Sequence, residues 1–134
     1  MTIRTLIRDN RGAAVIEMAF ALPTIITLIW IMLQLAMVFR ASSGIQHALG
    51  EGARAATVWS VAGVDAAAIK TKVEAAVYGI GPGTFTVPTP TAGTGCDSQC
   101  LDVTVNYSQN TDMLFFPGPT INISHTKRVW MAKS

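Results

Sequence analysis

Charged residues are scarce in this chain of 134 residues. They make up 13% of it, about half the share found in average soluble proteins. The apolar excess lies near the N-terminus, which points to a membrane anchor. The net charge is +2 and basic residues form no block, so no nucleic-acid binding is expected. The chain has two histidines and two cysteines. Because they lack metal-ligand spacing, no metal site and no cofactor is predicted.

The first third of the chain contains a long run with a single charge. Arg11 and Arg40 bound the run, and Glu17 is the only charged residue between them. About 20 apolar residues in a helix cross a bilayer, so residues 13–40 are predicted to form a transmembrane helix. The run is too long for the apolar core of an ordinary secretory signal peptide. Because arginines precede it, the positive-inside rule places the N-terminus in the cytoplasm.

The same helix is predicted to continue beyond the membrane as an amphipathic stem extension over residues 41–62. Pro23 lacks an N–H, so a kink or local opening is expected there. Gln34 is a polar residue inside the span, which either bonds to another helix or lies near the outer interface. Small and apolar residues then recur at helical spacing and predict a packing stripe: Ile45, Leu49, Gly52, Ala56 and Trp59.

Residues 63–134 are predicted to form an extracytoplasmic head. Asp65 is well placed to cap a short second helix, and Gly79 is a natural end for it. The predicted buried face of that helix is Ile69, Val73, Ala76 and Val77. Together with the strands that follow, these helices predict an α+β fold, in which a long membrane-spanning stem helix and a short second helix join a small antiparallel β-sheet.

Alternating apolar residues predict the strands of the head. Three segments have this pattern: residues 84–87, 101–108 and 120–131. The first is expected at a sheet edge because Pro88 follows it. The apolar residues 113–116 fit either a short strand or a loop tip. Packing in the core is the favoured interpretation for them, and binding of a partner is the second.

Cys96 and Cys100 are close in sequence. If the head is extracytoplasmic, a disulfide between them is expected, and two free thiols are the alternative. Such a disulfide closes a small loop, so it would stiffen a local turn and do little for the global fold.

The N-terminal residues resemble those of TadE-like minor pilins from Tad (Flp-type, type IV pilin-like) pilus systems. Residues 1–12 are a short basic leader that ends in Gly12, and Glu17 is the fifth residue after that glycine. The resemblance implies that a prepilin peptidase cuts between Gly12 and Ala13. Residues 49–56, which include Arg54, are similar to the small-residue stretch after the membrane helix in this family. The residues expected to take part in packing between stems are Pro23, Gln34, Arg54 and Trp59.

The resemblance also implies a role. It suggests a structural or assembly component of a Tad-type pilus, not an enzyme, whose partners are the prepilin peptidase, other pilin-like subunits and the inner-membrane assembly platform. The protein would lie in the bacterial inner membrane with its head in the periplasm, and in the extracellular pilus after assembly. Two alternatives stay open: an unprocessed single-pass membrane protein with a periplasmic interaction domain, and a type II secretion pseudopilin.

Glu17 has two possible roles. Cleavage would give Ala13 an α-amino group with a pKa near 8 and a positive charge, and this amine on a neighbouring subunit could pair with Glu17. A carboxylate in lipid costs on the order of 3 kcal/mol, which such a pair would offset. The alternative is a carboxylate that lies near headgroups and water.

Overall fold

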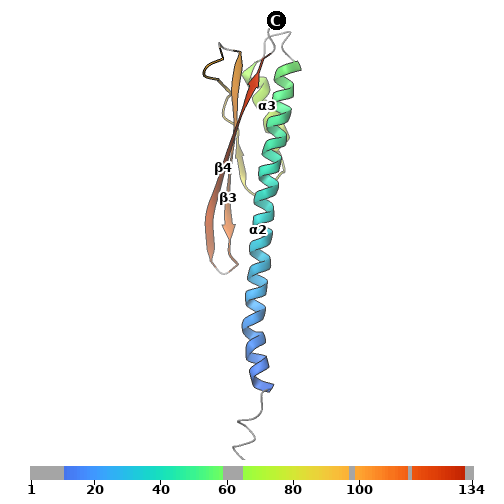
Figure 1. The fold of residues 1–134 in the computed structure, drawn as a ribbon, viewed down its shortest axis with the longest axis vertical. Helices are drawn as coiled ribbons and strands as arrows, with labels where there is room; N and C mark the ends of the chain where they lie inside the picture. Colours follow the sequence, from blue (N-terminus) through green and yellow to red (C-terminus); the bar gives the residue numbers. More distant parts are fainter. Residues whose placement is uncertain (1–10, 59–64, 97–98, 115, 132–134) are drawn as a thin grey trace, which may run out of the picture.

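A single long helix organises the molecule (Figure 1). The structure is a computed structural model that describes residues 11–58, 65–96, 99–114 and 116–131. Helix α2 (Arg11–Val58) contains 48 residues, which corresponds to about 72 Å at 1.5 Å per residue. A small β-sheet lies along its C-terminal half. The predicted α+β fold is confirmed, while leader residues 1–10 and Trp59 lie outside the described residues.

Helix α2 continues through Pro23 without interruption, so the local opening expected there is not observed. Proline removes one backbone donor, the one that would bond to the carbonyl of Ala19. Two threonines next to it bond back to the preceding turn: Thr24 Oγ1 donates to the Phe20 carbonyl at 2.8 Å, and Thr27 Oγ1 donates to the Pro23 carbonyl at 2.7 Å. The rest of the ladder therefore stays helical around a single missing bond.

Helix α3 (Ala66–Val77) begins and ends where the sequence predicts. Asp65 caps it, because its Oδ1 accepts from the Ala67 N–H at 3.0 Å. Gly79 follows its end with φ of +75°, a conformation that favours glycine. The apolar face of α3 is buried against α2 and the sheet, as predicted: Ile69, Val73 and Val77 are at most 4% exposed.

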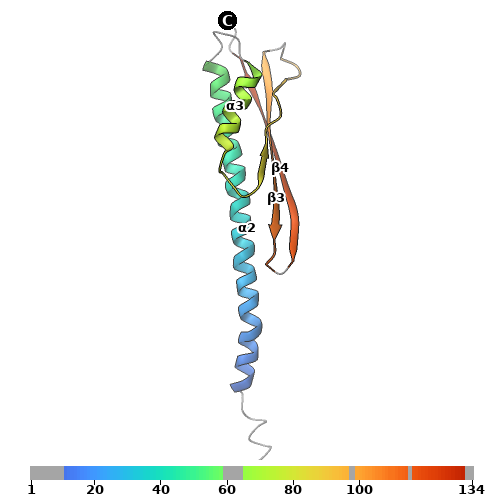
Figure 2. The ribbon, with the colours of Figure 1, turned by 180° about the vertical axis from the view of Figure 1, so that it is seen from behind.

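Among the described residues the sheet has four antiparallel strands, and the other three all pair with the central one (Figure 2). Strand β4 pairs with β3 along nearly its whole length, while β1 and β2 pair with two separate stretches of β3. The strands are β1 (Thr84–Thr86), β2 (Thr91–Ala92), β3 (Cys100–Asp112) and β4 (Pro117–Trp130). Strand β1 is at an edge as predicted, and both β3 and β4 are longer than predicted.

One face of the sheet packs on the helices and forms the core. Val103, Val105 and Tyr107 of β3 alternate toward this face and are at most 1% exposed. They belong to the same buried cluster as Ile45 of α2, which is fully buried. The predicted packing stripe is thereby confirmed for its described members Ile45, Leu49, Gly52 and Ala56.

The described apolar residues of the 113–116 segment, Met113, Leu114 and Phe116, lie in the turn between β3 and β4 rather than in the core. Leu114 is 45% exposed and Phe116 is 62% exposed, so the favoured prediction of core packing is wrong for these two residues. The reason is the length of the hairpin. Strands β3 and β4 run past the end of the core toward the N-terminal half of α2 (Figure 1), where no other described part of the head covers Leu114 and Phe116.

Candidate stem and membrane interface

The predicted processing junction lies in the first turns of α2. Gly12, Ala13 and Glu17 are all exposed, and Ala13 and Glu17 are about 6 Å apart along the helix axis. No ion pair joins Glu17 to another described side chain. The structure therefore presents a carboxylate on an apolar helix, one turn from the place where cleavage would create an amine.

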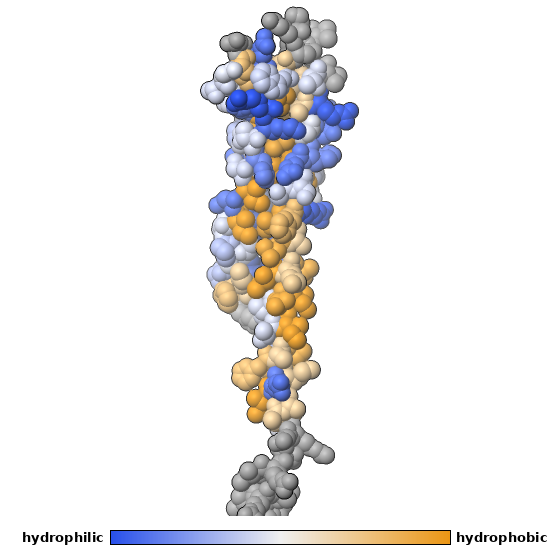
Figure 3. All heavy atoms as spheres, in the orientation of Figure 1, coloured by the Kyte–Doolittle hydropathy of each residue, from blue (hydrophilic) through white to orange (hydrophobic). Residues whose placement is uncertain are grey.

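The N-terminal half of α2 is apolar and uncovered. By length and composition the helix can cross a membrane, and none of its most apolar window is buried in the molecule. Exposed large apolar residues occur along this half, from Val15 at 69% to Leu33 at 51%. Hydrophobic surface runs along the lower stem, and hydrophilic residues gather on the upper head (Figure 3). A helix that is apolar all round needs lipid or other apolar helices around it.

A set of hydrogen bonds ties the β3–β4 hairpin to α2, and we call it the clasp. The Trp30 Nε1–H donates to the Asp112 carbonyl at 2.7 Å. Gln34 Nε2 donates to the same carbonyl at 3.4 Å, and Gln34 Oε1 accepts from Gln109 Nε2 at 3.3 Å. Gln34 is thus engaged within its own chain, and its predicted bond to another helix is not needed to satisfy it.

The clasp continues into the core of the head. Gln109 is only 3% exposed, and its Oε1 accepts from the Tyr107 hydroxyl at 2.5 Å. That hydroxyl in turn accepts from the Gly83 N–H at 3.2 Å. A buried amide without partners costs about 1–3 kcal/mol. These hydrogen bonds avoid that cost, so Gln109 can be buried beside the stem.

The clasp is not among the contacts predicted from the sequence, although the pattern of β3 contains a signal for it. The inward positions of β3 continue beyond Tyr107 to Gln109 and Thr111, which are buried and polar. Two buried polar residues at the end of an apolar stripe require polar partners. Gln34 of the span supplies one for Gln109, while Thr111 donates to the Pro119 carbonyl within the hairpin.

Two of the predicted stem-packing residues are exposed. Arg54 is 81% exposed at its side chain and lies 3.8 Å from Glu51, a pair of little energetic weight at the surface. Pro23 is exposed and borders an open apolar groove on α2 that extends to Leu35. Both are accessible to a neighbouring subunit.

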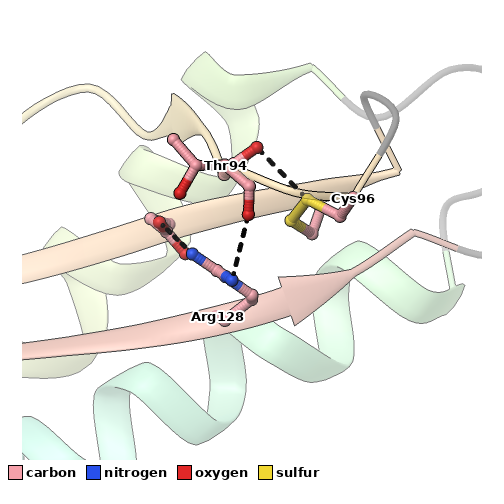
Figure 4. The surroundings of a disulfide bond; sticks show 6 residues. Thr94, Cys96 and Arg128 are labelled. Atoms are coloured by element: carbon pink, nitrogen blue, oxygen red, sulfur yellow. Dashed lines mark hydrogen bonds and ion pairs between the residues drawn. A yellow bond between two sulfur atoms is a disulfide. The ribbon is translucent and has the colours of Figure 1, made fainter.

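The two cysteines form a disulfide (Figure 4). It lies at the start of β3, whereas the hairpin turn follows the other end of that strand. Cys96 and Cys100 have Cα atoms 5.9 Å apart. An added Cβ at Gly93 would clash with the Cys100 sulfur and lie 3.2 Å from the Cys96 sulfur, so the disulfide leaves no room for a side chain there. The disulfide therefore shapes the turn that leads into β3.

An ion pair between Arg128 and Asp102 lies next to the disulfide. Arg128 donates from Nε and Nη2 to the two carboxylate oxygens of Asp102 at 2.8 and 2.9 Å, and from Nη1 to the Thr94 carbonyl at 3.3 Å (Figure 4). The hydrogen bonds from Arg128 hold the pKa of Asp102 below its usual value. The pair joins β3, β4 and the turn that precedes the disulfide.

The stem is similar to a known protein family. The family model described as TadE-like protein matches residues 12–54, a segment within α2 that begins at Gly12 and ends at Arg54. The resemblance drawn from the sequence is thereby confirmed over the stem, and this family implies a component associated with a Tad pilus. No curated protein and no solved structure matches the chain.

Proposed function

We propose that this TadE-like chain is a minor pilin or assembly component of a Tad-type pilus, made as a precursor that a prepilin peptidase cuts between Gly12 and Ala13. The observation that carries the proposal is the family match over residues 12–54, which starts at the glycine before the cut. The role is structural rather than enzymatic. The partners are the prepilin peptidase, other pilin-like subunits and the Tad inner-membrane assembly platform.

The folded chain does not explain why residue 12 is glycine. A Cβ added there meets no described atom within 4 Å, and glycine in a helix costs roughly 1 kcal/mol relative to alanine. A requirement outside the fold accounts for the residue. Without a side chain at Gly12, a peptidase cleft can approach the backbone closely.

The position of Glu17 also supports processing and assembly into a pilus. A carboxylate in lipid costs on the order of 3 kcal/mol, and the described part of the chain offers it no ion-pair partner. Cleavage would give Ala13 a positive α-amino group, and a neighbouring subunit shifted along the fibre can bring this amine to Glu17. Buried ion pairs serve specificity better than stability, so the pair sets the register between subunits.

The uncovered half of α2 suits both stages of this role. Before assembly, its apolar side chains lie in lipid with the N-terminus in the cytoplasm and the head in the periplasm. After assembly, the same side chains pack against the stems of neighbouring subunits. The groove between Pro23 and Leu35 is open to such a neighbour.

One observation favours a second candidate, an unprocessed single-pass membrane protein with a periplasmic interaction domain. Helix α2 already begins at Arg11 and is continuous across the proposed cut. A peptidase must therefore unwind the first turn of the helix before it can cleave after Gly12.

Cleavage can be tested directly by mass spectrometry of the full chain expressed with its prepilin peptidase. We expect the wild-type protein to start at Ala13 and Gly12→Val to keep its leader. Gly50→Val is the matched control, because an added Cβ at Gly50 also meets no atom within 4 Å, and it should be cleaved normally. An intact leader on the wild-type protein would support the second candidate.

The register role of Glu17 requires a separate test. Glu17→Gln should still be cleaved but should be lost from sheared pilus fractions, because a neutral amide cannot pair with the Ala13 amine. Glu51→Gln changes an exposed glutamate of the same helix and should be incorporated like the wild-type protein. Normal incorporation of Glu17→Gln would show that the pair does not guide assembly.

A further inference from the structure

We propose that the turn of the β3–β4 hairpin is a second membrane contact, which lies in the outer headgroup and acyl boundary beside the stem. We call Met113, Leu114 and Phe116 the hairpin tip. The proposal rests on the proposed membrane-spanning role of α2. It adds that the head touches the lipid surface through this tip for as long as the stem is in the membrane.

The depth of the hairpin tip follows from the clasp. Trp30 bonds to the Asp112 carbonyl at 2.7 Å, so the tip begins at the level of Trp30 on α2. A hydrocarbon core about 30 Å thick takes up about 20 helical residues. A span that starts at Ala13 therefore ends near Met32, and Trp30 lies at its outer edge, where tryptophan is enriched.

The hairpin tip also reaches the membrane if the bilayer is placed differently along α2. If the hydrocarbon core begins after Glu17 instead, about 20 residues bring its outer edge near Met37. The hairpin tip then lies deeper. The first placement leaves the charged Asp112 at headgroup level, where a carboxylate costs less than in the hydrocarbon core, and we favour it for that reason.

The distribution of charge along the hairpin agrees with this depth. Near the disulfide, the hairpin carries Asp102, Lys127 and Arg128. From Met113 to Ser124 the chain carries no charged residue, and between Asp102 and Asp112 there is none either. The half of the hairpin that lies next to the apolar stem is thus free of charge apart from Asp112. A hairpin surrounded by water at both ends would not require this asymmetry.

The conformation of Leu114 is the most direct sign of an outside contact. Its φ is +56°, in the left-handed region that glycine or asparagine normally occupies and that costs a larger residue about 1–2 kcal/mol. Its side chain is 45% exposed, and that of Phe116 is 62% exposed. Neither turn geometry nor core packing accounts for a leucine at this position, whereas insertion into lipid does.

Lipid is the occupant to which we commit, in preference to a second copy of the chain. The clasp fixes the tip against the same helix that spans the bilayer, so the tip meets lipid before any partner arrives. A small crevice of about 80 Å³ between α2 and the hairpin is also lined by apolar side chains, including Ile31, Leu35 and Met113. The polar residues Gln34, Thr111 and Asp112 line the same crevice, so apolar side chains of the stem and of the tip meet there beside the clasp.

Spin labels on the full-length protein in phosphatidylethanolamine and phosphatidylglycerol vesicles test the proposal. Single cysteines at Leu114, Ile25 and Lys127 are labelled while the native disulfide stays oxidised. Power saturation then compares contact with oxygen, which partitions into lipid, and with a water-soluble nickel chelate. We expect the labels at Leu114 and Ile25 to favour oxygen and the label at Lys127 to favour nickel. A Phe116→Cys label repeats the measurement if Leu114→Cys disturbs the turn.

The pattern of the labels shows whether the tip contact fails alone or together with the membrane-spanning role of α2. If Ile25 favours oxygen and Leu114 favours nickel, the tip is in water and the proposal fails while the span stands. If the Leu114 label is shielded from both reagents, a protein covers the tip and the lipid contact is wrong. If Ile25 itself favours nickel, both the span and the tip contact fail. With Trp30→Phe, which removes the clasp donor, the Leu114 label should shift toward nickel; an unchanged depth would mean that the clasp does not set it.

Discussion

Replacing Gly52 with alanine should loosen the attachment of α3 to the stem. A Cβ added at Gly52 would lie 2.6 Å from Cγ2 of Val73, closer than real carbon atoms approach. Val73 is fully buried and its β-branched side chain is stiff about χ1, so the contact is relieved only if α3 moves. Overpacking of this kind costs typically about 1–3 kcal/mol.

Gly50→Ala is the matched control for this variant. It makes the same chemical change two residues away, at a position where an added Cβ meets nothing within 4 Å. Both variants gain roughly 1 kcal/mol from the higher helix propensity of alanine, and this gain cancels when they are compared. The difference between the two variants is therefore the cost of the contact with Val73, centred on about 2 kcal/mol.

Thermal unfolding of the full chain in detergent measures this difference. The near-ultraviolet circular dichroism of the buried Tyr107 reports on the head rather than on the stem helix. For a chain of this size about 1 kcal/mol shifts Tm by roughly 3–5 °C, so Gly52→Ala should melt roughly 6–10 °C below Gly50→Ala. If Gly52→Ala melts at or above the control, the close packing of α2 on α3 does not stabilise the head as reasoned.

Two further predictions concern polar contacts of the head. Gln34→Leu leaves the buried Nε2 donor of Gln109 without its acceptor, so it should destabilise the head by about 1–3 kcal/mol in the same melting assay, whereas the exposed Gln46→Leu should be neutral; equal Tm values would argue against the clasp. Asp102→Asn tests the pair with Arg128: because the folded-state pKa of Asp102 is lowered, its stabilising effect is present above its ordinary pKa and is lost as the pH falls through the lowered value. Below about pH 4 the wild-type Tm should therefore fall more steeply than that of Asp102→Asn, and parallel pH profiles would contradict this.

The elements of the fold could be predicted because their signals are local. Apolar spacing predicted α2 and the buried face of α3, while Asp65 and Gly79 predicted the ends of α3. Strict alternation predicted the middle of β3. Their ends were predicted less well, since β3 and β4 continue into residues whose apolar pattern is weaker. Pairing between two long strands keeps them extended there, and no local signal reports that pairing.

Of the candidate site, only the residues of the predicted processing junction could be predicted from the sequence, and the clasp could not. Gly12 and Glu17 are informative by themselves, because a lone acid in a charge-free run and a glycine before it stand out in any window. The clasp joins residues 75 to 82 positions apart in the chain. Trp30 alone predicts an interfacial anchor and Gln109 alone an ordinary strand residue, so their contact is invisible until the register of β3 on β4 and of the sheet on α2 is known.

The sequence by itself determined that this chain has an apolar stem with one acid near its start and a small α+β head, since hydrophobicity and periodicity are properties of neighbouring residues. Only the tertiary structure decided how far the head reaches down the stem. That reach depends on the length over which β3 and β4 pair and on the few hydrogen bonds that Trp30 and Gln34 make to the hairpin. The same contacts place Leu114 and Phe116, which were expected in the core, in an exposed apolar turn beside the stem helix.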